Sequence, residues 1–352
     1  MNKIGLIISS FFVLFLVSCE NKEKYKDVNT FTFDDFGKSI ALQSETIDFD
    51  EPIMLPRRIL LVDSILLVEN KNTEFLLYRY NVLSRKKTGE CIAFGSGPNE
   101  LLTIKHIQSV DSCIYISDNQ KRVVFEYNKH DLCHGSNPEP RKAVTTNEAI
   151  SSFQHIPDGY VSTTMNPFNK RLLFFNSEGD FTETKGEYPS FGKEITGIEK
   201  VEGYLADMTF DPVSKRIFLF YAQTDLLEIY DLTGKLIKRM HGPDQFFPHV
   251  KEIALDGGYS KVSPVYGESR EAYYAPIIVN NEVYVSYSGA FRESKRAPIT
   301  TILVFSIDGY PLRRYELSEP IIAFTIDPAT KNIYATSDNP EFHLIKFKNK
   351  TK

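Results

Sequence analysis

The chain lacks the short motifs that assemble a catalytic centre from neighbouring residues. It contains no His-Glu-x-x-His, Gly-x-Ser-x-Gly or Cys-x-x-Cys. One cluster, His130-Asp131-Leu132-Cys133-His134, has the side chains of a metal site. It falls where a turn is expected after a strand, so we interpret it as an exposed polar hairpin. The sequence therefore predicts no metal and no cofactor, and it leaves any catalytic residues unknown.

Polar residues recur instead in six loops that each follow a short apolar segment. These loops are 69–72, 118–122, 166–171, 223–225, 288–292 and 338–340. Such a surface suits a polar ligand, for example a glycan or an acidic sugar, although Asn and Asp are also common turn residues. Guanidinium groups in these loops suit carboxylate or sulfate groups. The predicted ligand-binding residues are Arg122, Arg171, Arg292, Asn70, Asn119 and Tyr287.

One of these loops is longer than the rest and is expected to determine specificity. It gains about ten residues between Gly289 and Pro298, including Arg292, Lys295 and Arg296. Insertions within a repeat usually map to one face, often the binding face. The preceding linker, residues 256–271, is also long and rich in Gly, Ser and Tyr.

The elements that position these loops are short strands in a recurring pattern. A β-branched or aromatic strand runs into each polar loop, and these strands begin at Ile65, Ile114, Tyr160, Ile217, Val283 and Ile333. A second strand follows and ends in an aromatic residue or Ile, usually before Asn or Asp, as in Tyr80-Asn81 and Tyr230-Asp231. Gly-containing turns and further strands complete units of four strands in about fifty residues, as is typical of propeller blades.

Six such units predict an all-β chain that forms a six-bladed β-propeller with four-stranded blades. The expected blades are 52–95, 102–145, 150–190, 201–245, 271–316 and 319–348. The sixth unit stops after its third strand, and Ser39–Ile47 alternates well enough to supply the missing outer strand. Such a strand would join the ends of the ring and cover a sheet edge. Two stacked β-sandwich domains are the alternative, which the single repeat disfavours.

The N-terminus has the pattern of an export signal. Lys3 precedes an apolar run, Ile4 to Val17, which is too short to span a bilayer permanently. The run ends in Leu16-Val17-Ser18-Cys19, which resembles the lipobox of bacterial lipoproteins; an ordinary secretory signal is the alternative. We expect a signal peptide over 1–18, lipid on Cys19, a solvated tether over 19–38 and the propeller over 39–352. The expected location is the cell envelope, at the outer membrane of a Gram-negative bacterium.

Composition limits the partners and the redox chemistry. The formal net charge is −5 and no basic block is present, so nucleic acid is not an expected partner. Cys91, Cys113 and Cys133 remain after Cys19. Because three is an odd number and their spacing is irregular, buried thiols are favoured over a disulfide bond.

A glycine-rich segment suggests a family. Phe94-Gly95-Ser96-Gly97-Pro98-Asn99-Glu100 leaves the first blade, and His241-Gly242-Pro243-Asp244 echoes it in the fourth. A phosphate cradle would need a helix behind the glycines, and none is predicted. Together with the lipobox, the segment resembles the six-bladed propeller lipoproteins of Gram-negative anaerobes, grouped with TolB-like and NHL-like propellers. The resemblance implies the fold but supplies no catalytic signature.

Two functions remain open. The favoured one is a binding or scaffold module at the membrane, for a glycan or an envelope protein. The alternative is a propeller hydrolase or lyase acting on an extracellular polysaccharide or a small ester, an enzyme type that often places calcium and carboxylates in its channel. The candidate carboxylates are expected to be turn residues on the opposite face, and they are Asp63, Asp111, Asp158, Asp211 and Asp327.

Overall fold

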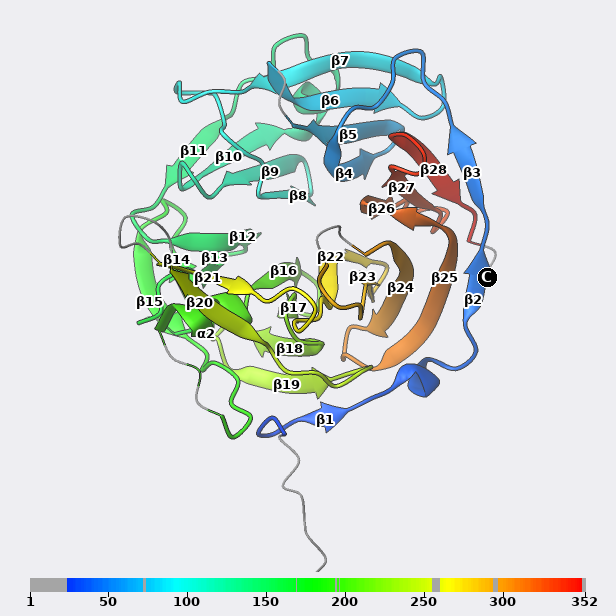
Figure 1. The fold of residues 1–352 in the computed structure, drawn as a ribbon. Helices are drawn as coiled ribbons and strands as arrows, with labels where there is room; N and C mark the ends of the chain where they lie inside the picture. Colours follow the sequence, from blue (N-terminus) through cyan, green and yellow to red (C-terminus); the bar gives the residue numbers. More distant parts are fainter. Residues whose placement is uncertain are drawn as a thin grey trace, which may run out of the picture.

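The computed structural model describes residues 24–71, 74–168, 170–193, 195, 197–254, 260–293 and 297–349. Six antiparallel sheets are arranged in a ring, each with its first strand nearest the axis (Figure 1). The predicted six-bladed β-propeller is therefore confirmed. The expected signal peptide and Cys19 lie outside the described residues. No helix in the described part of the chain is long and apolar enough to span a bilayer.

Blades one to three are formed by consecutive strands. Blade one contains β4 (Pro56–Val62), β5 (Ile65–Asn70), β6 (Phe75–Asn81) and β7 (Lys86–Ala93). Blade two contains β8 (His106–Val110), β9 (Cys113–Asp118), β10 (Val123–Asn128) and β11 (Lys142–Thr145). Blade three contains β12 (Ile150–Ile156), β13 (Gly159–Thr164), β14 (Leu172–Phe175) and β15 (Phe181–Lys185).

Blades four to six each gain a strand from the N-terminal region. Blade four contains β16 (Ala206–Asp211), β17 (Arg216–Tyr221), β18 (Leu226–Asp231) and β19 (Leu236–His241), plus β1 (Asn29–Thr30). Blade five contains β22 (Tyr273–Val279), β23 (Glu282–Tyr287), β24 (Ile299–Ser306) and β25 (Pro311–Ile321), plus β2 (Ile40–Leu42). Blade six contains β26 (Ala323–Ile326), β27 (Ile333–Ser337) and β28 (His343–Phe347), plus β3 (Ser44–Ile47).

The second strand of a blade is buried on both faces, which explains why these segments are continuous apolar runs rather than alternating apolar and polar residues. Every residue of β5 is buried, and so is every residue of β13, because a neighbouring blade covers each face of the sheet. The turns that enter these strands hold the expected aspartates. Asp63 has a φ of 53°, and Asp211 Oδ2 accepts a hydrogen bond from Ser214 N at 2.7 Å. Their assignment as turn residues is confirmed.

The N-terminal segment closes the ring, as predicted, but in two strands rather than one. β3 pairs antiparallel with β28, with Ile47 opposite Leu344, and supplies the missing outer strand of blade six. The strand is interrupted at Gln43, and the part before it, β2, runs parallel to β25 of blade five. The expected single strand over 39–47 is therefore divided between two blades, since the segment crosses from one sheet edge to the next.

The expected tether over 19–38 needs correction from residue 24 onward. Tyr25, Phe31 and Phe36 are all buried. β1 lies between Tyr25 and Phe31, and the 3₁₀ helix η1 (Phe33–Phe36) ends at Phe36. Their aromatic rings pack against blades four and five and bury apolar surface there, whereas a solvated tether would stay exposed to water. Residues 24–47, hereafter the arm, follow the outside of the ring past blades four, five and six (Figure 1).

The two ends of the ring differ in their connections. Loops after the second and fourth strands of every blade meet at one end, hereafter the loop face, and hairpins after the first and third strands meet at the other, the turn face. The loop face also contains α2 (Gly197–Gly203) and the hairpin β20–β21 (Val250–Ala254 and Ser260–Pro264). In Figure 1 this hairpin lies in front of blade three. The loop face therefore holds the larger and more varied segments.

Candidate functional site

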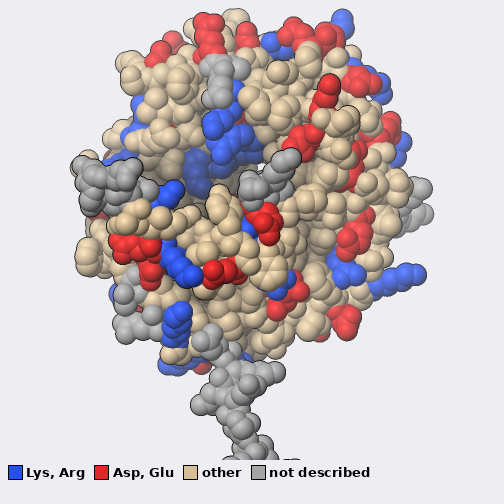
Figure 2. All heavy atoms as spheres, in the orientation of Figure 1, with Lys and Arg blue, Asp and Glu red and all other residues tan. Residues whose placement is uncertain are grey.

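The loop face is hollowed at its centre. Lys and Arg gather on the wall of this hollow formed by blades one and two, whereas Asp and Glu are scattered around the rim of the ring (Figure 2). The innermost strands surround the hollow and present polar side chains to it. Four of these form a group that we call the channel-mouth cluster: Arg58 of β4, Lys105, His106 of β8 and Asp207 of β16.

An ion pair spans the channel mouth. Lys105 Nζ lies 3.9 Å from Asp207 Oδ1, which joins blades two and four across the inner strand of blade three. This distance is too long for a hydrogen bond. Lys105 Nζ donates no hydrogen bond to any described residue, although its backbone N is fixed by a 2.8 Å bond to Ser117 O. The backbone of Lys105 is thus fixed, while the three donors of its ammonium group stay available.

Arg58 lies beside this pair and is only partly satisfied. Its Nη1 donates to Glu69 Oε2 at 2.9 Å and to Ile104 O at 2.7 Å. Because Ile104 precedes Lys105, the second bond brings the guanidinium next to the backbone at the start of β8. Nε and Nη2 have no partner among the described residues, and the side chain is 31% exposed. Arg58 therefore presents unused donors toward solvent at the channel mouth.

The charges of the cluster affect one another. Burial and then the positive charge of Arg58 lower the pKa of His106 to about 4, so its imidazole is neutral at pH 7. The His106 ring contacts the side-chain amide of Gln154. Burial alone would raise the pKa of Asp207, but Lys105 and a hydrogen bond from Ala275 N (3.1 Å) outweigh it and lower that pKa. Asp207 is therefore an anion that balances Lys105.

The glycine-rich segment positions Lys105 rather than forming a phosphate cradle. Glu100 folds back so that its Oε2 accepts from Gly97 N at 2.7 Å. A Cβ on either Gly95 or Gly97 would collide with that carboxylate. Lys121 Nζ donates to Gly97 O at 2.7 Å and to Glu100 O at 2.6 Å. The linker between blades one and two is thereby fixed by its own side chains.

Asp118 fixes the rest of that linker. Its buried carboxylate accepts from Leu102 N at 2.7 Å and from Thr103 N at 3.1 Å, two residues before Lys105. Carboxylates that accept backbone N–H groups make strong, charge-assisted hydrogen bonds. The site is thus pre-organised by residues that do not themselves face the channel.

The predicted ligand-binding residues are distributed over blades one, two, three and five. Arg171 is 1% exposed and lies between blades three and four. Its Nε donates to Tyr221 Oη at 3.2 Å, and its guanidinium lies over the rings of Tyr188 and Tyr221. Arg171 is therefore buried rather than presented to solvent, because tyrosines of the neighbouring segments enclose it.

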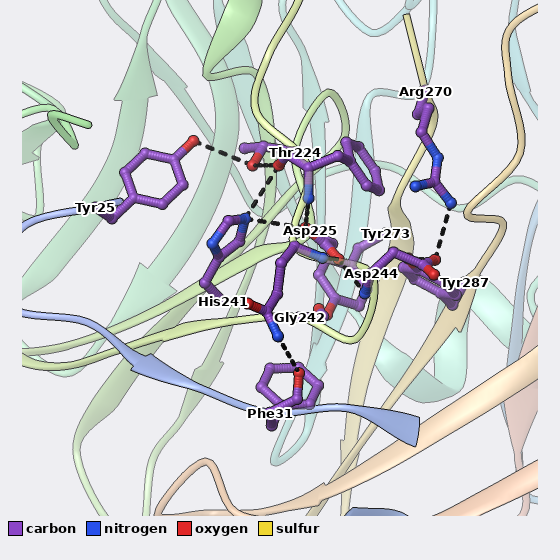
Figure 3. A network of polar contacts seen from close by, with 12 residues as sticks. Tyr25, Phe31, Thr224, Asp225, His241, Gly242, Asp244, Arg270, Tyr273 and Tyr287 are labelled. Atoms are coloured by element: carbon purple, nitrogen blue, oxygen red, sulfur yellow. Dashed lines mark hydrogen bonds and ion pairs between the residues drawn. The ribbon is translucent and has the colours of Figure 1, made fainter. Parts of the chain in front are cut away.

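Tyr287 and Arg292 lie at the boundary between blades four and five. The Tyr287 hydroxyl donates to Asp244 Oδ2 at 2.6 Å, and Arg270 Nη2 lies 3.0 Å from the same oxygen (Figure 3). The Tyr287 ring is buried, so it fixes the linker after β19 rather than offering a surface. Arg292 Nη1 lies 3.2 Å from Glu271 Oε1 and is half-buried.

The same boundary also holds the start of the arm. Asp225, which is fully buried, accepts from the backbone N of Asp244 and Gln245, both at 2.7 Å, and lies 3.2 Å from His241 Nε2. The Tyr25 ring packs edge-on against His241, and its hydroxyl lies 3.1 Å from Thr224 Oγ1 (Figure 3). This network is a structural joint between the arm, blade four and the linker to blade five.

The remaining predicted residues belong to blades one and two. Arg122 is exposed and donates to Asn147 O at 2.8 Å, Asn119 is half-buried, and Asn70 is 4% exposed. No hydrogen bond or ion pair between described residues joins any two of the six predicted residues. Asn72, Asn169, Lys295, Arg296 and the linker residues 256–259 lie outside the described residues.

Sequence reasoning missed the channel-mouth cluster, although signals for it exist. Arg57 and Arg58 interrupt the start of an otherwise apolar strand, and Asp207 is a charged residue within another. Charged residues on an innermost strand, where burial is expected, mark a channel lining. The contact between Lys105 and Asp207 could not be predicted, because the two residues are far apart in sequence.

The metal-like cluster forms a helix, not the expected hairpin. α1 (Lys129–His134) is capped by Asn128, whose side chain accepts from Asp131 N. The rings of His130 and His134 are 5.0 Å apart and exposed, whereas Cys133 is buried. Within the described ranges no group of three or more His, Cys, Asp or Glu could hold a metal. Cys91, Cys113 and Cys133 are all free thiols.

The fold and the site define a class: a six-bladed β-propeller with a charged channel mouth on its loop face. A model of the TolB-like six-blade propeller-like family matches residues 34–329, and the chain belongs to that family. A member of the DUF4221 family from Bacteroides vulgatus is similar in structure, with a TM-score of 0.56 and 9% identity, covering 88% of this chain and 96% of that one.

A second similar structure comes from Bacteroides fragilis and is described as that of an exported protein. Its TM-score is 0.56 at 13% identity, and the match covers 93% of this chain and 99% of that chain. Identities this low support the fold and nothing finer. No curated protein matches the sequence.

Proposed function

We propose that this protein is an exported, lipid-anchored binding module of the cell envelope that engages a glycan or an envelope protein through its loop face. The observation that carries the proposal is the unequal exposure of apolar side chains on the two faces. Among the described residues, large exposed hydrophobic side chains of the loop face are Met54, Leu55, Phe94, Met165, Phe168, Ile198, Ile253, Tyr266 and Phe291.

The turn face exposes fewer such side chains, although it is built from the same strands. In the described chain its hairpins expose Leu83, Val213 and Tyr310, and the outer strands that leave these hairpins expose Phe181, Ile237 and Leu312. Apolar side chains gathered on one polar-rimmed face usually mark an interaction surface. Aromatic rings also offer large contact area at low entropic cost, which suits both sugars and protein partners.

Exposed polar residues complete the proposed surface. Arg122, Asn119 and Arg292 keep polar groups accessible on the loop face and stay proposed ligand contacts. Arg171, Asn70 and Tyr287 are buried, so we propose that they act by fixing the loops.

Matched substitutions on the two faces test the proposal. Phe94, Phe168 and Phe291 would be changed together to Ser, and Leu83, Val213 and Tyr310 likewise in a control protein. These six side chains are comparably exposed, so both variants should melt at the wild-type temperature. On an array of neutral and acidic glycans and of envelope extracts, the loop-face variant should lose binding and the control should keep it. Equal binding by both variants would refute the proposal.

Lipid anchoring needs its own test. The support is the sequence Leu16-Val17-Ser18-Cys19 after an apolar run, together with the exported description of the similar Bacteroides fragilis protein. Cys19→Ala should abolish incorporation of a labelled fatty acid and release the protein from the membrane fraction. Continued labelling of the variant would show that the anchor lies elsewhere.

A further inference from the structure

Resting on the proposed function, we propose that the channel mouth holds a subsite for one oxyanion of the ligand, a carboxylate or sulfate group of an acidic glycan. Arg58 and Lys105 bind this group, and Asp207 occupies the competing position while no ligand is bound.

The first support is the set of unused donors. Arg58 has Nε and Nη2 without a partner among the described residues, and Lys105 Nζ donates no hydrogen bond to them. Arg58 Nη1 is 2.7 Å from Ile104 O, and the positive charges of Arg58 and Lys105 both lower the pKa of Asp207. A guanidinium fork beside an ammonium group is suited to a planar or tetrahedral oxyanion.

The second support is the built-in competitor. Asp207 reaches Lys105 from the far side of blade three, yet stops at 3.9 Å. Its other oxygen accepts a hydrogen bond from Ala275 N at 3.1 Å, which opposes movement of the carboxylate toward Lys105. A ligand oxyanion that comes within 3 Å of Lys105 would therefore bind it better than Asp207 does.

The third support concerns the surroundings of the subsite. His106 is neutral, and Gln154 donates from its amide to Met208 O at 3.0 Å, so the wall beside the cations is polar without being charged. The loop face also exposes aromatic rings, those of Phe94, Phe168 and Phe291 among them, in loops of blades one, three and five. Cationic donors at the channel mouth and aromatic rings on the same face suit a sugar that bears an acidic group better than an acidic peptide.

Opposite charge changes at Lys105 and Asp207 provide the test, using the full-length protein in detergent micelles. The probes are an oligogalacturonate, a sulfated oligosaccharide, a neutral oligosaccharide of equal length and poly-glutamate, measured by calorimetry at two salt concentrations. Lys105→Met should weaken binding of an acidic oligosaccharide tenfold or more. Asp207→Asn removes the competitor but keeps an oxygen for Ala275 N, so it should tighten binding about threefold or more.

The matched control is Lys251→Met, which removes an equal charge from the hairpin on the same face. It should leave the affinity within about twofold of wild type. A structural role for the channel pair would weaken binding in both channel variants, whereas the subsite predicts changes of opposite sign.

The possible results separate the two proposals. Binding of only the neutral oligosaccharide, or acidic binding that ignores both channel substitutions, overturns the subsite and leaves the binding function intact. Binding of poly-glutamate alone overturns the assignment to a glycan. Absence of binding by every probe, together with equal behaviour of the two face variants, overturns the subsite and the proposed function together.

Discussion

The half of the ring that the arm covers differs from the half that it leaves bare. Blades four to six each pair with an arm strand, and a charge network is buried beneath it. Glu228, which is fully buried, accepts from Arg239 Nε at 2.6 Å and from Tyr230 Oη at 2.8 Å. Arg239 in turn donates to Lys26 O of the arm at 2.7 Å. Blades one to three have no arm strand and hold the unused donors of Arg58 and Lys105.

The difference shows where this propeller tolerates a charged side chain that lacks a full set of hydrogen-bond partners. In the covered half every charged group of the network finds a partner, because a buried charge without one is costly. In the bare half, Arg58 and Lys105 reach the solvent of the channel, where hydration replaces a partner at little cost. Substitutions in the covered half should therefore change stability, and substitutions at the channel mouth should change binding.

The largest effect is expected from removing the arm. A soluble chain that begins at residue 51 should unfold without a cooperative transition, whereas one that begins at residue 24 should melt normally. Burying a large apolar side chain contributes about 1.5–3 kcal/mol. The arm buries five: Tyr25, Phe31, Phe36, Leu42 and Ile47. That sum approaches the whole stability of a typical domain. Equal melting temperatures by calorimetry would show that the arm is dispensable.

A smaller but still large effect is expected at Glu228. Glu228→Gln should lower the free energy of unfolding by about 3–5 kcal/mol, because it leaves Arg239 buried without a counter-charge. The matched control is Glu183→Gln, which breaks a pair with Lys185 that is roughly half exposed. That change should stay within about 0.5 kcal/mol in urea titrations. Comparable losses in both variants would contradict the contrast between buried and exposed pairs.

A pH-dependent effect is expected at the channel mouth. His106 has a folded-state pKa of about 4, below the ordinary value of 6.5, so the unfolded chain binds its proton more readily. The stabilisation from keeping this ring neutral is complete above pH 6.5 and is lost as the pH falls toward 4, by up to about 3 kcal/mol. His106→Gln should flatten the curve of unfolding free energy over that interval. An unchanged slope would show that His106 does not titrate in this way.

The smallest effect is expected at Arg292. Arg292→Ala should change the free energy of unfolding by less than about 1 kcal/mol, since its pair with Glu271 is partly exposed. Arg171→Ala is the informative comparison, because that buried guanidinium fills space between two tyrosines. Thermal melts should separate the two arginines clearly, and similar melting temperatures would place Arg171 at the surface after all.

Some of this architecture is readable from sequence because it depends on local order. Strand, turn and strand follow one another within each blade. The composition of segments such as Ile65–Asn70 and Ile333–Ser337 is therefore enough to predict them as strands. The closing strand was predictable because the sixth unit visibly lacks one. Arg171 and Tyr25 were misplaced because their burial depends on partners such as Tyr221 and His241, which come from remote parts of the chain. The channel-mouth cluster was missed for the same reason.

The packing of the arm also limits how far the propeller could lie from a lipid on Cys19. Six residue steps separate Cys19 from the buried Tyr25. A fully extended linker of that length spans about 20 Å, compared with about 65 Å for one that continued to residue 38. A propeller anchored by lipid at Cys19 would therefore diffuse in a thin layer beside the bilayer. Its loop face would meet membrane-bound partners at a high effective concentration and would not reach partners across a wide gap.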